Sequence, residues 1–160
     1  MRSWVLGLSL IVLALVGFWF FRSRPTALPL WTPPEHRATA ILGNREFFLD
    51  IADTLALREQ GLSGRAGLPE NGGMIFLFDE PSPAAFWMKG MLFPIDIFWI
   101  RDNTIIAIKE QAEPPAPGTP PEALPRFIPP QPADIVIETR AGMARDLGIQ
   151  TGQEVHILLP

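Results

Sequence analysis

The sequence predicts an α+β fold: a compact β-rich domain with a mixed, largely antiparallel sheet or partly open barrel and two short helices, preceded by one N-terminal transmembrane helix. Two observations predict the sheet. Short apolar runs recur between turn signals, and two of these runs are apolar at nearly every position. A third observation predicts the membrane helix, because the 18 residues from Trp4 to Phe21 include no charged side chain.

A helix over Trp4–Phe21 would rise about 27 Å, just enough to cross a hydrocarbon core of about 30 Å. Arginines flank the stretch, and tryptophan and phenylalanine lie near its ends. A cleaved signal peptide is the alternative, but it would have a shorter apolar stretch and a small-x-small cleavage site. We therefore predict that residues 1–24 form an uncleaved anchor or signal, and that residues 25–37, with four prolines, form a linker.

The remaining chain is acidic. Three of the 13 Lys and Arg residues lie within residues 1–24, which leaves 10 against 17 Asp and Glu and a net charge of −7 for residues 25–160. This balance argues against a nucleic-acid partner, which requires clustered cations. The chain has no cysteine, and His36 and His156 have no ligand-like spacing, so we expect neither a metal nor another cofactor.

Turn signals and apolar runs predict eight strands in residues 38–160. Gly43-Asn44 and Asp102-Asn103 are turn signals between neighbouring strands. Met74–Phe78 and Ile95–Ile100 lack the alternation of a half-exposed strand, so we expect both to be central and covered on both faces. The expected strands are Thr39–Leu42, Glu46–Ile51, Met74–Phe78, Ala85–Lys89, Ile95–Ile100, Thr104–Ile108, Asp134–Glu138 and Glu154–Leu159.

Two short helices complete the expected domain. Asp53 or Thr54 can cap the first, which would run to about Gln60 and end at Gly61. Its expected core residues are Leu55, Ala56 and Leu62. Thr139 can cap the second, closed by Gly148 and with Met143, Ala144 and Leu147 as its apolar residues.

Residues 113–132 hold nine of the chain's 18 prolines. Proline lacks the backbone donor that helices and central strands require, so a stiff surface loop with polyproline character is expected. Such a loop is either a ligand for an aromatic groove on a partner or a tolerated insertion.

Several blocks of sequence, in this order, resemble the bacterial and archaeal family called domain of unknown function 192. The resemblance covers residues 38–159 and implies a compact β-rich α+β domain, often behind an N-terminal signal or anchor. It implies no activity, because the family has no established one. The blocks are Arg58–Arg65, Gly73–Phe78, Phe86–Lys89, Pro94–Phe98, Ile137-Glu138 with Ala141–Ala144, and Gly148-Ile149 with Gly152.

The chain departs from that family at one place. After Trp-Met-Lys the family usually continues with Asn-Thr, whereas Gly90-Met91 stand here. A side-chain amide and a hydroxyl are therefore lost, which can change or abolish a ligand site. The loop over residues 113–132 is also longer than the family's usual connection.

Asp96 is the first candidate site residue, because a carboxylate within an apolar strand is very costly unless it has a partner. Lys89 and Arg65 are the expected partners. Asp96 is either part of a polar pocket with a shifted pKa or a buried polar tie that fixes loops to the sheet.

Glu138 and Trp87 are further candidates. Glu138 can favour the positive end of the following helix, or it can face the same pocket as Asp96, where two carboxylates can do acid–base work. Trp87 is either a core residue or, beside Lys89 at a pocket rim, a platform for a glycan.

We therefore expect a membrane-anchored binding or accessory module of the cell envelope, without catalytic activity, on the periplasmic side of the inner membrane. Its ligand would be a small molecule, a glycan or an envelope protein. One alternative is a small cell-envelope enzyme that uses Asp96 and Glu138 with Lys89 or Arg65. Another is a structural interaction protein that docks through its proline-rich loop. The expected pocket comprises Arg65, Trp87, Lys89, Asp96 and Glu138.

Overall fold

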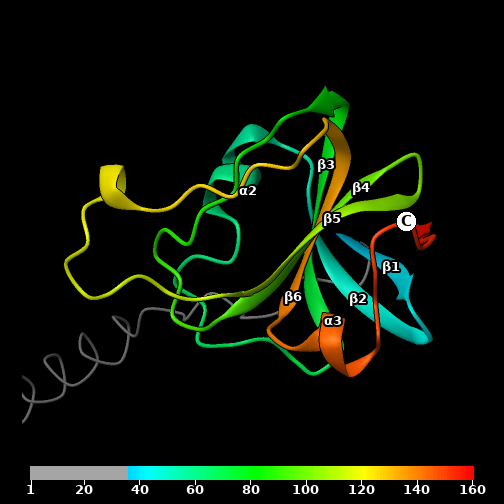
Figure 1. The fold of residues 1–160 in the computed structure, drawn as a ribbon, viewed down its shortest axis with the longest axis horizontal. Coiled ribbons are helices and arrows are strands. Elements are labelled where there is room, and N and C mark those ends of the chain that lie inside the picture. Colours follow the sequence, from blue (N-terminus) through cyan, green and yellow to red (C-terminus); the bar gives the residue numbers. More distant parts are fainter. Residues whose placement is uncertain (1–35) are drawn as a thin grey trace, which may run out of the picture. The chain divides into compact units, whose positions relative to one another are not determined.

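The computed structural model describes residues 36–160, which form a seven-stranded half-barrel sheet with two short α-helices (Figure 1). Residues 1–35, with the expected anchor and most of the expected linker, lie outside the described part, although Arg37 already belongs to the first strand. Within residues 36–160 no helix is long and apolar enough to span a membrane. The strands are β1 (Arg37–Leu42), β2 (Arg45–Ala52), β3 (Gly72–Ser82), β4 (Ile95–Arg101), β5 (Thr104–Ala112), β6 (Ala133–Arg140) and β7 (His156–Leu158).

The sheet is mixed, as expected. Its order is β5-β4-β6-β3-β2-β1-β7, and only β2 and β3 pair in parallel. A parallel pair needs a crossover connection, and the segment that includes α2 (Leu55–Gln60) provides it. The two ends of the sheet approach each other, since Thr104 forms a bridge with Glu154 and the Ile105 amide donates to the Gln153 carbonyl at 2.9 Å.

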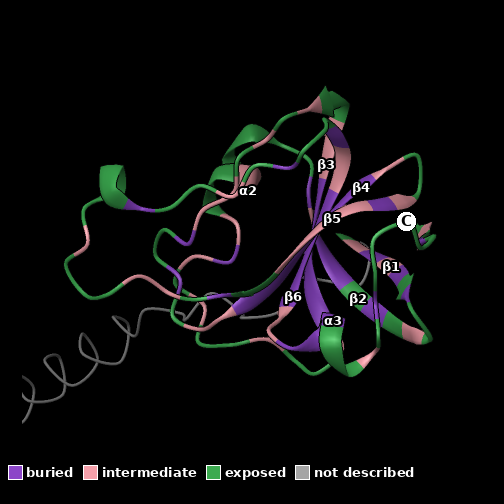
Figure 2. Ribbon diagram, in the orientation of Figure 1, coloured by how far each residue is buried: buried purple, intermediate pink, exposed green. Residues whose placement is uncertain are grey.

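Both faces of the central strands are buried, which confirms the prediction from the two non-alternating runs (Figure 2). One apolar cluster, the inner core, includes α3 (Met143–Asp146) and the segment before β7. The other, the outer core, is covered by loops. The inner core includes Leu42, Phe47, Leu49, Ile75, Phe98, Ile137 and Met143. The outer core includes Leu62, Met74, Phe76, Met88, Met91, Ile97 and Trp99.

Not every expected strand forms. Ala85–Lys89 was predicted as a strand, but Phe86 alone makes an isolated bridge, to Phe127, and the rest of the segment is irregular. This prediction is wrong because the apolar residues there cover the outer core as a loop instead of joining the sheet. The last strand is also shorter than expected and covers only His156–Leu158.

The first helix begins and ends as predicted, but its core residues differ. The Thr54 hydroxyl accepts from the Leu57 amide at 3.3 Å, and Gly61 at the C-terminus has a φ of +50°. Leu62 is buried, whereas Leu55 and Ala56 are exposed, so those two assignments are wrong. The helix itself buries no residue, and the turn that follows it supplies the packing side chain.

The second helix is shorter than predicted. Strand β6 continues through Thr139 to Arg140, so Thr139 is a fully buried strand residue and not a helix cap. Gly142, with a φ of +91°, precedes α3 instead. Met143 and Ala144 are buried as expected, because α3 closes over the inner core.

The proline-rich segment 113–132 is a long loop between β5 and β6, with only a short 3-10 helix, η2, at Pro121–Ala123. In Figure 1 its yellow portion extends away from the sheet. Its second half returns to the domain. Leu124 is buried, and Phe127 exchanges two backbone hydrogen bonds of 2.8 and 2.9 Å with Phe86. The loop is therefore anchored on the outer core beside the segment at Phe86.

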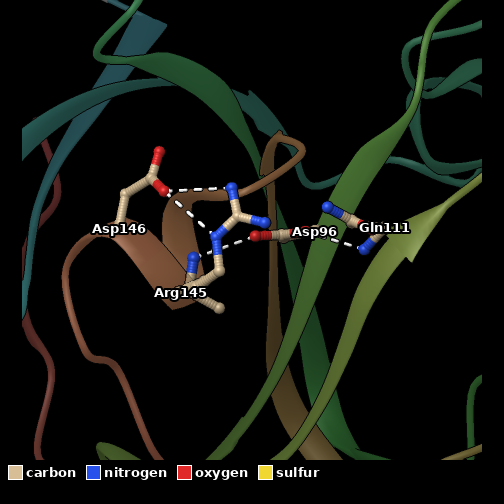
Figure 3. Close-up of polar contacts among 5 residues, drawn as sticks. Asp96, Gln111, Arg145 and Asp146 are labelled. Carbon is tan, nitrogen blue, oxygen red and sulfur yellow. Dashed lines mark hydrogen bonds and ion pairs between the residues drawn. The ribbon is translucent and has the colours of Figure 1, made fainter.

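Asp96 is fully buried and is a structural tie within the inner core (Figure 3). Its carboxylate accepts from the Gln111 amide at 2.8 Å and from the Ala144 amide at 2.9 Å. One side chain thus joins β4 to the irregular end of β5 and to the first turn of α3. The expected partners Lys89 and Arg65 are wrong, because Arg65 pairs with Asp50 and Lys89 is exposed.

Replacing Asp96 with alanine should destabilise the fold strongly, because two backbone donors lose a charged acceptor. We expect a loss of roughly 3–5 kcal/mol in the free energy of unfolding. Asp96→Asn should cost less, because one amide oxygen remains as an acceptor. Urea unfolding of the full chain at neutral pH measures both.

Asp146→Ala on the exposed side of α3 is the matched control, since its pair with Arg145 is exposed. It should cost below about 1 kcal/mol. Equal losses for Asp96→Ala and Asp146→Ala would show that the buried tie contributes nothing special.

Candidate functional site

The two candidate carboxylates lie on opposite faces of the sheet. In the pairing of β4 with β6, Asp96 is opposite Thr139 and Ile97 is opposite Glu138. Paired residues project to the same face, and neighbours along a strand project to opposite faces. Asp96 therefore points into the inner core and Glu138 to the outer face. The expected joint action of Asp96 and Glu138 has no geometric support.

A small cleft lies over Glu138 on the outer face. It is lined by α2 and the turn after it, by Phe76 of β3, and by the segment from Phe86 to Met91. The enclosed volume of the cleft is only about 30 Å³, room for about two water molecules, and its mouth is open to solvent. A ligand can therefore insert only one small group, with the rest of the molecule at the mouth.

Glu138 is 5% exposed. Its carboxyl group makes no hydrogen bond or ion pair with any residue in the described part of the chain. Burial raises the pKa of Glu138 to about 8, and the positive charge of Arg65 partly opposes this rise. At neutral pH the carboxyl group is therefore mostly protonated. It lines the cleft, where water or a ligand can bond to its oxygens.

Arg65 is fixed beside Glu138 by a buried ion-pair network. Asp50 is 4% exposed, and its carboxylate pairs with Arg65 Nη1 at 2.7 Å and with Arg37 Nε at 3.0 Å. The register places Asp50, Met74 and Glu138 in one row across β2, β3 and β6. Arg65 thus joins the turn after α2 to the same face of the sheet that carries Glu138.

The facing wall of the cleft is held to this turn by hydrogen bonds to two of its backbone carbonyls. The Ser63 hydroxyl donates to the Lys89 carbonyl at 2.6 Å, and the Gly64 amide donates to the Gly90 carbonyl at 2.9 Å. Gly90 has a φ of +68°, a conformation that glycine adopts readily and asparagine tolerates. Met91 is buried and lines the cleft, so the departure from Asn-Thr places a thioether at the site.

Trp87 lines the cleft, and two cationic side chains make cation–π contacts with its ring. Lys89 Nζ lies 5.2 Å from the centre of its ring, and the Arg126 guanidinium lies 4.4 Å from it. Arg126 comes from the proline-rich loop, and Phe127 beside it is bridged to Phe86. Neither Lys89 nor Arg126 forms an ion pair with an acidic residue within residues 36–160.

Of the residues expected to form a pocket, the structure brings Trp87, Lys89 and Glu138 together around one cleft. Arg65 lies close enough to Glu138 to influence its charge, although its own bond is to Asp50. Asp96 lies on the other face. Asp50 and Arg126 were missed. Hydrophobic periodicity does not show that the turn after α2 covers Asp50 on β2, nor that the proline-rich loop returns to the domain and places Arg126 against Trp87. Among the described residues no group of three or more His, Asp or Glu is placed to hold a metal ion.

Two solved structures are similar to this chain. One is described as a putative transcription regulator from Sinorhizobium meliloti 1021, with 31% identity and a TM-score of 0.64 over 75% of this chain and 91% of that chain. The other is a protein of unknown function from Novosphingobium aromaticivorans DSM 12444, with 28% identity and a TM-score of 0.66 over 82% of this chain and 94% of that one. None of the curated proteins matches significantly.

A family model also matches, over residues 38–157. It is the model of domain of unknown function 192 (DUF192), described as an uncharacterized ACR. The match covers both helices, the cleft, the proline-rich loop and the sheet apart from its end residues Arg37 and Leu158. The sequence blocks that suggested this family therefore lie within one continuous match, and the chain belongs to the DUF192 family.

Proposed function

We propose that this domain is a binding module without catalytic activity, and that its cleft receives a small molecule through Glu138. One observation carries the proposal: a buried carboxyl group opens to the cleft without a protein hydrogen-bond partner. A ligand that reaches this group can form a hydrogen bond with it without displacing a protein partner. Arg65, whose charge acts on Glu138, is already committed to Asp50.

The geometry favours binding over catalysis. General acid–base catalysis by two carboxylates requires both to reach the substrate. Here Asp96 lies on the opposite face with its oxygens bonded to backbone amides. The net negative charge of residues 25–160 also disfavours binding to nucleic acid. We therefore do not extend to this chain the role in transcription regulation that the description of the Sinorhizobium relative names.

In the same proposal, residues 1–24 anchor the module in the inner membrane, with the domain on the periplasmic side. The support is the uncharged 18-residue stretch from Trp4 to Phe21. A binding domain on a short proline-containing linker would then sample ligands close to the membrane surface.

The charge state of Glu138 should be visible in the pH dependence of stability. Its folded pKa of about 8 lies above the ordinary value of 4.5, so the folded state binds the extra proton between these pH values. The contribution of Glu138 to stability should therefore be greatest below about pH 4.5 and fall as pH rises to about 8. We expect Glu138→Gln to remove this loss, which is on the order of a few kcal/mol.

The measurement is urea unfolding of the full chain and of Glu138→Gln at several pH values from 5 to 8.5. The difference between the two free energies isolates Glu138, because the other titrating groups are shared. Parallel profiles would mean that Glu138 is ionised in the folded protein.

Ligand binding in the cleft should be detectable at two methionines. Met91 lines the cleft, whereas Met143 lies in the inner core on the other face. In full chain labelled with ¹³C at the methionine methyl groups, small polar molecules from a fragment library should shift the Met91 signal and leave Met143 unchanged. Glu138→Leu should abolish the Met91 shift while the unliganded Met143 signal stays in place.

Two outcomes would contradict the cleft as a binding site. One is a library in which no molecule moves Met91. The other is a Met91 shift that persists in Glu138→Leu, since the ligand would then not use the carboxyl group.

The anchor should keep the protein in the membrane fraction of cells. Deleting residues 2–24 should move the domain to the soluble fraction, because the apolar stretch is removed. N-terminal sequencing checks cleavage, and proteolysis of spheroplasts checks orientation. A mature N-terminus near Leu28 would refute the anchor, and protection of the domain in spheroplasts would refute the periplasmic side.

A further inference from the structure

The cations at the cleft contrast with the acidic balance of residues 25–160. Arg58 and Lys89 line the cleft, and Arg126 lies on the Trp87 ring that lines it. Two acidic residues line the cleft, Glu59 and Glu138. With Glu138 protonated at neutral pH, positive charges outnumber negative ones at this site. A local charge opposite to that of the surrounding domain favours an anionic ligand.

Two of these cations are available to a ligand. Arg58 is already engaged, since its Nη1 donates to the Asp53 carbonyl at 2.6 Å and to the Leu77 carbonyl at 2.9 Å. Lys89 and Arg126 are exposed, and each contacts the Trp87 ring instead of a carboxylate. Both can turn toward an anion without breaking an ion pair.

Glu138 matches the same kind of ligand. A protonated carboxyl group offers a hydrogen-bond donor, and a carboxylate is a strong acceptor for it. A ligand ammonium would instead face the positive charge of Arg65 beside Glu138. Phe76, Phe86 and Met91 also line the cleft, so a group attached to the carboxylate would meet apolar side chains.

We propose that the ligand of this cleft is a small molecule with a carboxylate, held by the carboxyl group of Glu138 and by Lys89, with Arg126 as a second cation that selects for it. This inference rests on the proposed function and specifies its ligand class. It also assigns a role to the proline-rich loop, which places Arg126 against Trp87.

Three probes with the same aromatic ring separate the charge classes. Benzoate is an anion, benzamide is neutral and benzylamine is a cation. Each is titrated into full chain labelled at the methionine methyl groups, with Met91 as the reporter and Met143 as the internal reference. We expect benzoate to bind most tightly at pH 7.

Lys89→Gln should weaken benzoate roughly tenfold, the loss of one charge-assisted hydrogen bond, and change benzamide by less than about twofold. Arg126→Gln should act in the same direction with a smaller effect. Arg145→Gln is the matched control, because Arg145 is an exposed cation on α3, which packs on the inner core and not at the cleft. It should leave benzoate binding unchanged.

The affinity for benzoate should fall as pH rises through the pKa of Glu138, because an ionised Glu138 repels the ligand. The charged groups that face Glu138 are Arg65, Arg58 and Glu59 from the turn and α2, Lys89 from the facing wall, and Asp50 and Lys109 in its row of the sheet. In Glu138→Gln these groups remain, so a benzoate affinity independent of pH assigns the dependence to Glu138.

Tighter binding of benzamide or benzylamine than of benzoate would overturn the carboxylate inference and leave the binding function intact. Unchanged benzoate affinity in both Lys89→Gln and Arg126→Gln would also overturn it. If neither these probes nor any library fragment moves Met91, the binding function itself fails.

Discussion

The structure depends on the burial of both faces of β3, β4 and β6. In a sheet with one wet face, every second side chain can be polar at no cost, but here neither face is wet along the centre. A charged residue in these strands must therefore find a partner within the protein or remain uncharged. Asp96 and Glu138 meet this requirement in opposite ways. Asp96 accepts two backbone hydrogen bonds, and Glu138 has none and holds its proton.

This difference follows from what covers each face. The inner core is covered by α3, whose first turn presents free backbone amides, and one of these donates to Asp96. The outer core is covered by loops. The Ser63 hydroxyl bonds to the Lys89 carbonyl, and the Gly64 amide bonds to the Gly90 carbonyl. Neither of these donors bonds to Glu138, whose carboxyl group lines the cleft.

Much of the fold was predictable because its signals are local. The apolar runs at Met74–Phe78 and Ile95–Ile100, the Asp102-Asn103 turn and the Gly61 helix end depend on a few neighbouring residues each. The assignments that failed needed tertiary information. Threonine is a residue type that often caps helices, but Thr139 pairs with Asp96 and therefore belongs to the sheet. Leucine is a typical core residue, but Leu55 belongs to α2, which buries none of its residues.

The candidate site was only partly predictable for the same reason. Trp87, Lys89 and Glu138 were identified by residue type, and the structure places all three at the lining of one cleft. Asp96 was grouped with them because sequence shows that a carboxylate is buried but not toward which face it points. Neighbouring residues of a strand project to opposite faces of the sheet, so Asp96 and Ile97 must lie on different faces. To infer from this that Glu138 lies on the face opposite to Asp96, one must know that Ile97 pairs with Glu138, and a single sequence does not show this pairing.

The proline-rich loop shows how a long irregular connection can reach the candidate site without entering the sheet. Its proline content excludes it from the sheet, yet two backbone hydrogen bonds between Phe127 and Phe86 fix its return point. These hydrogen bonds also restrict the backbone of the neighbouring residues, which include Arg126. Proline also reduces the entropy that the loop loses on ordering, so a long connection can hold a guanidinium in place at small cost. A flexible loop of the same length would place Arg126 over Trp87 only part of the time.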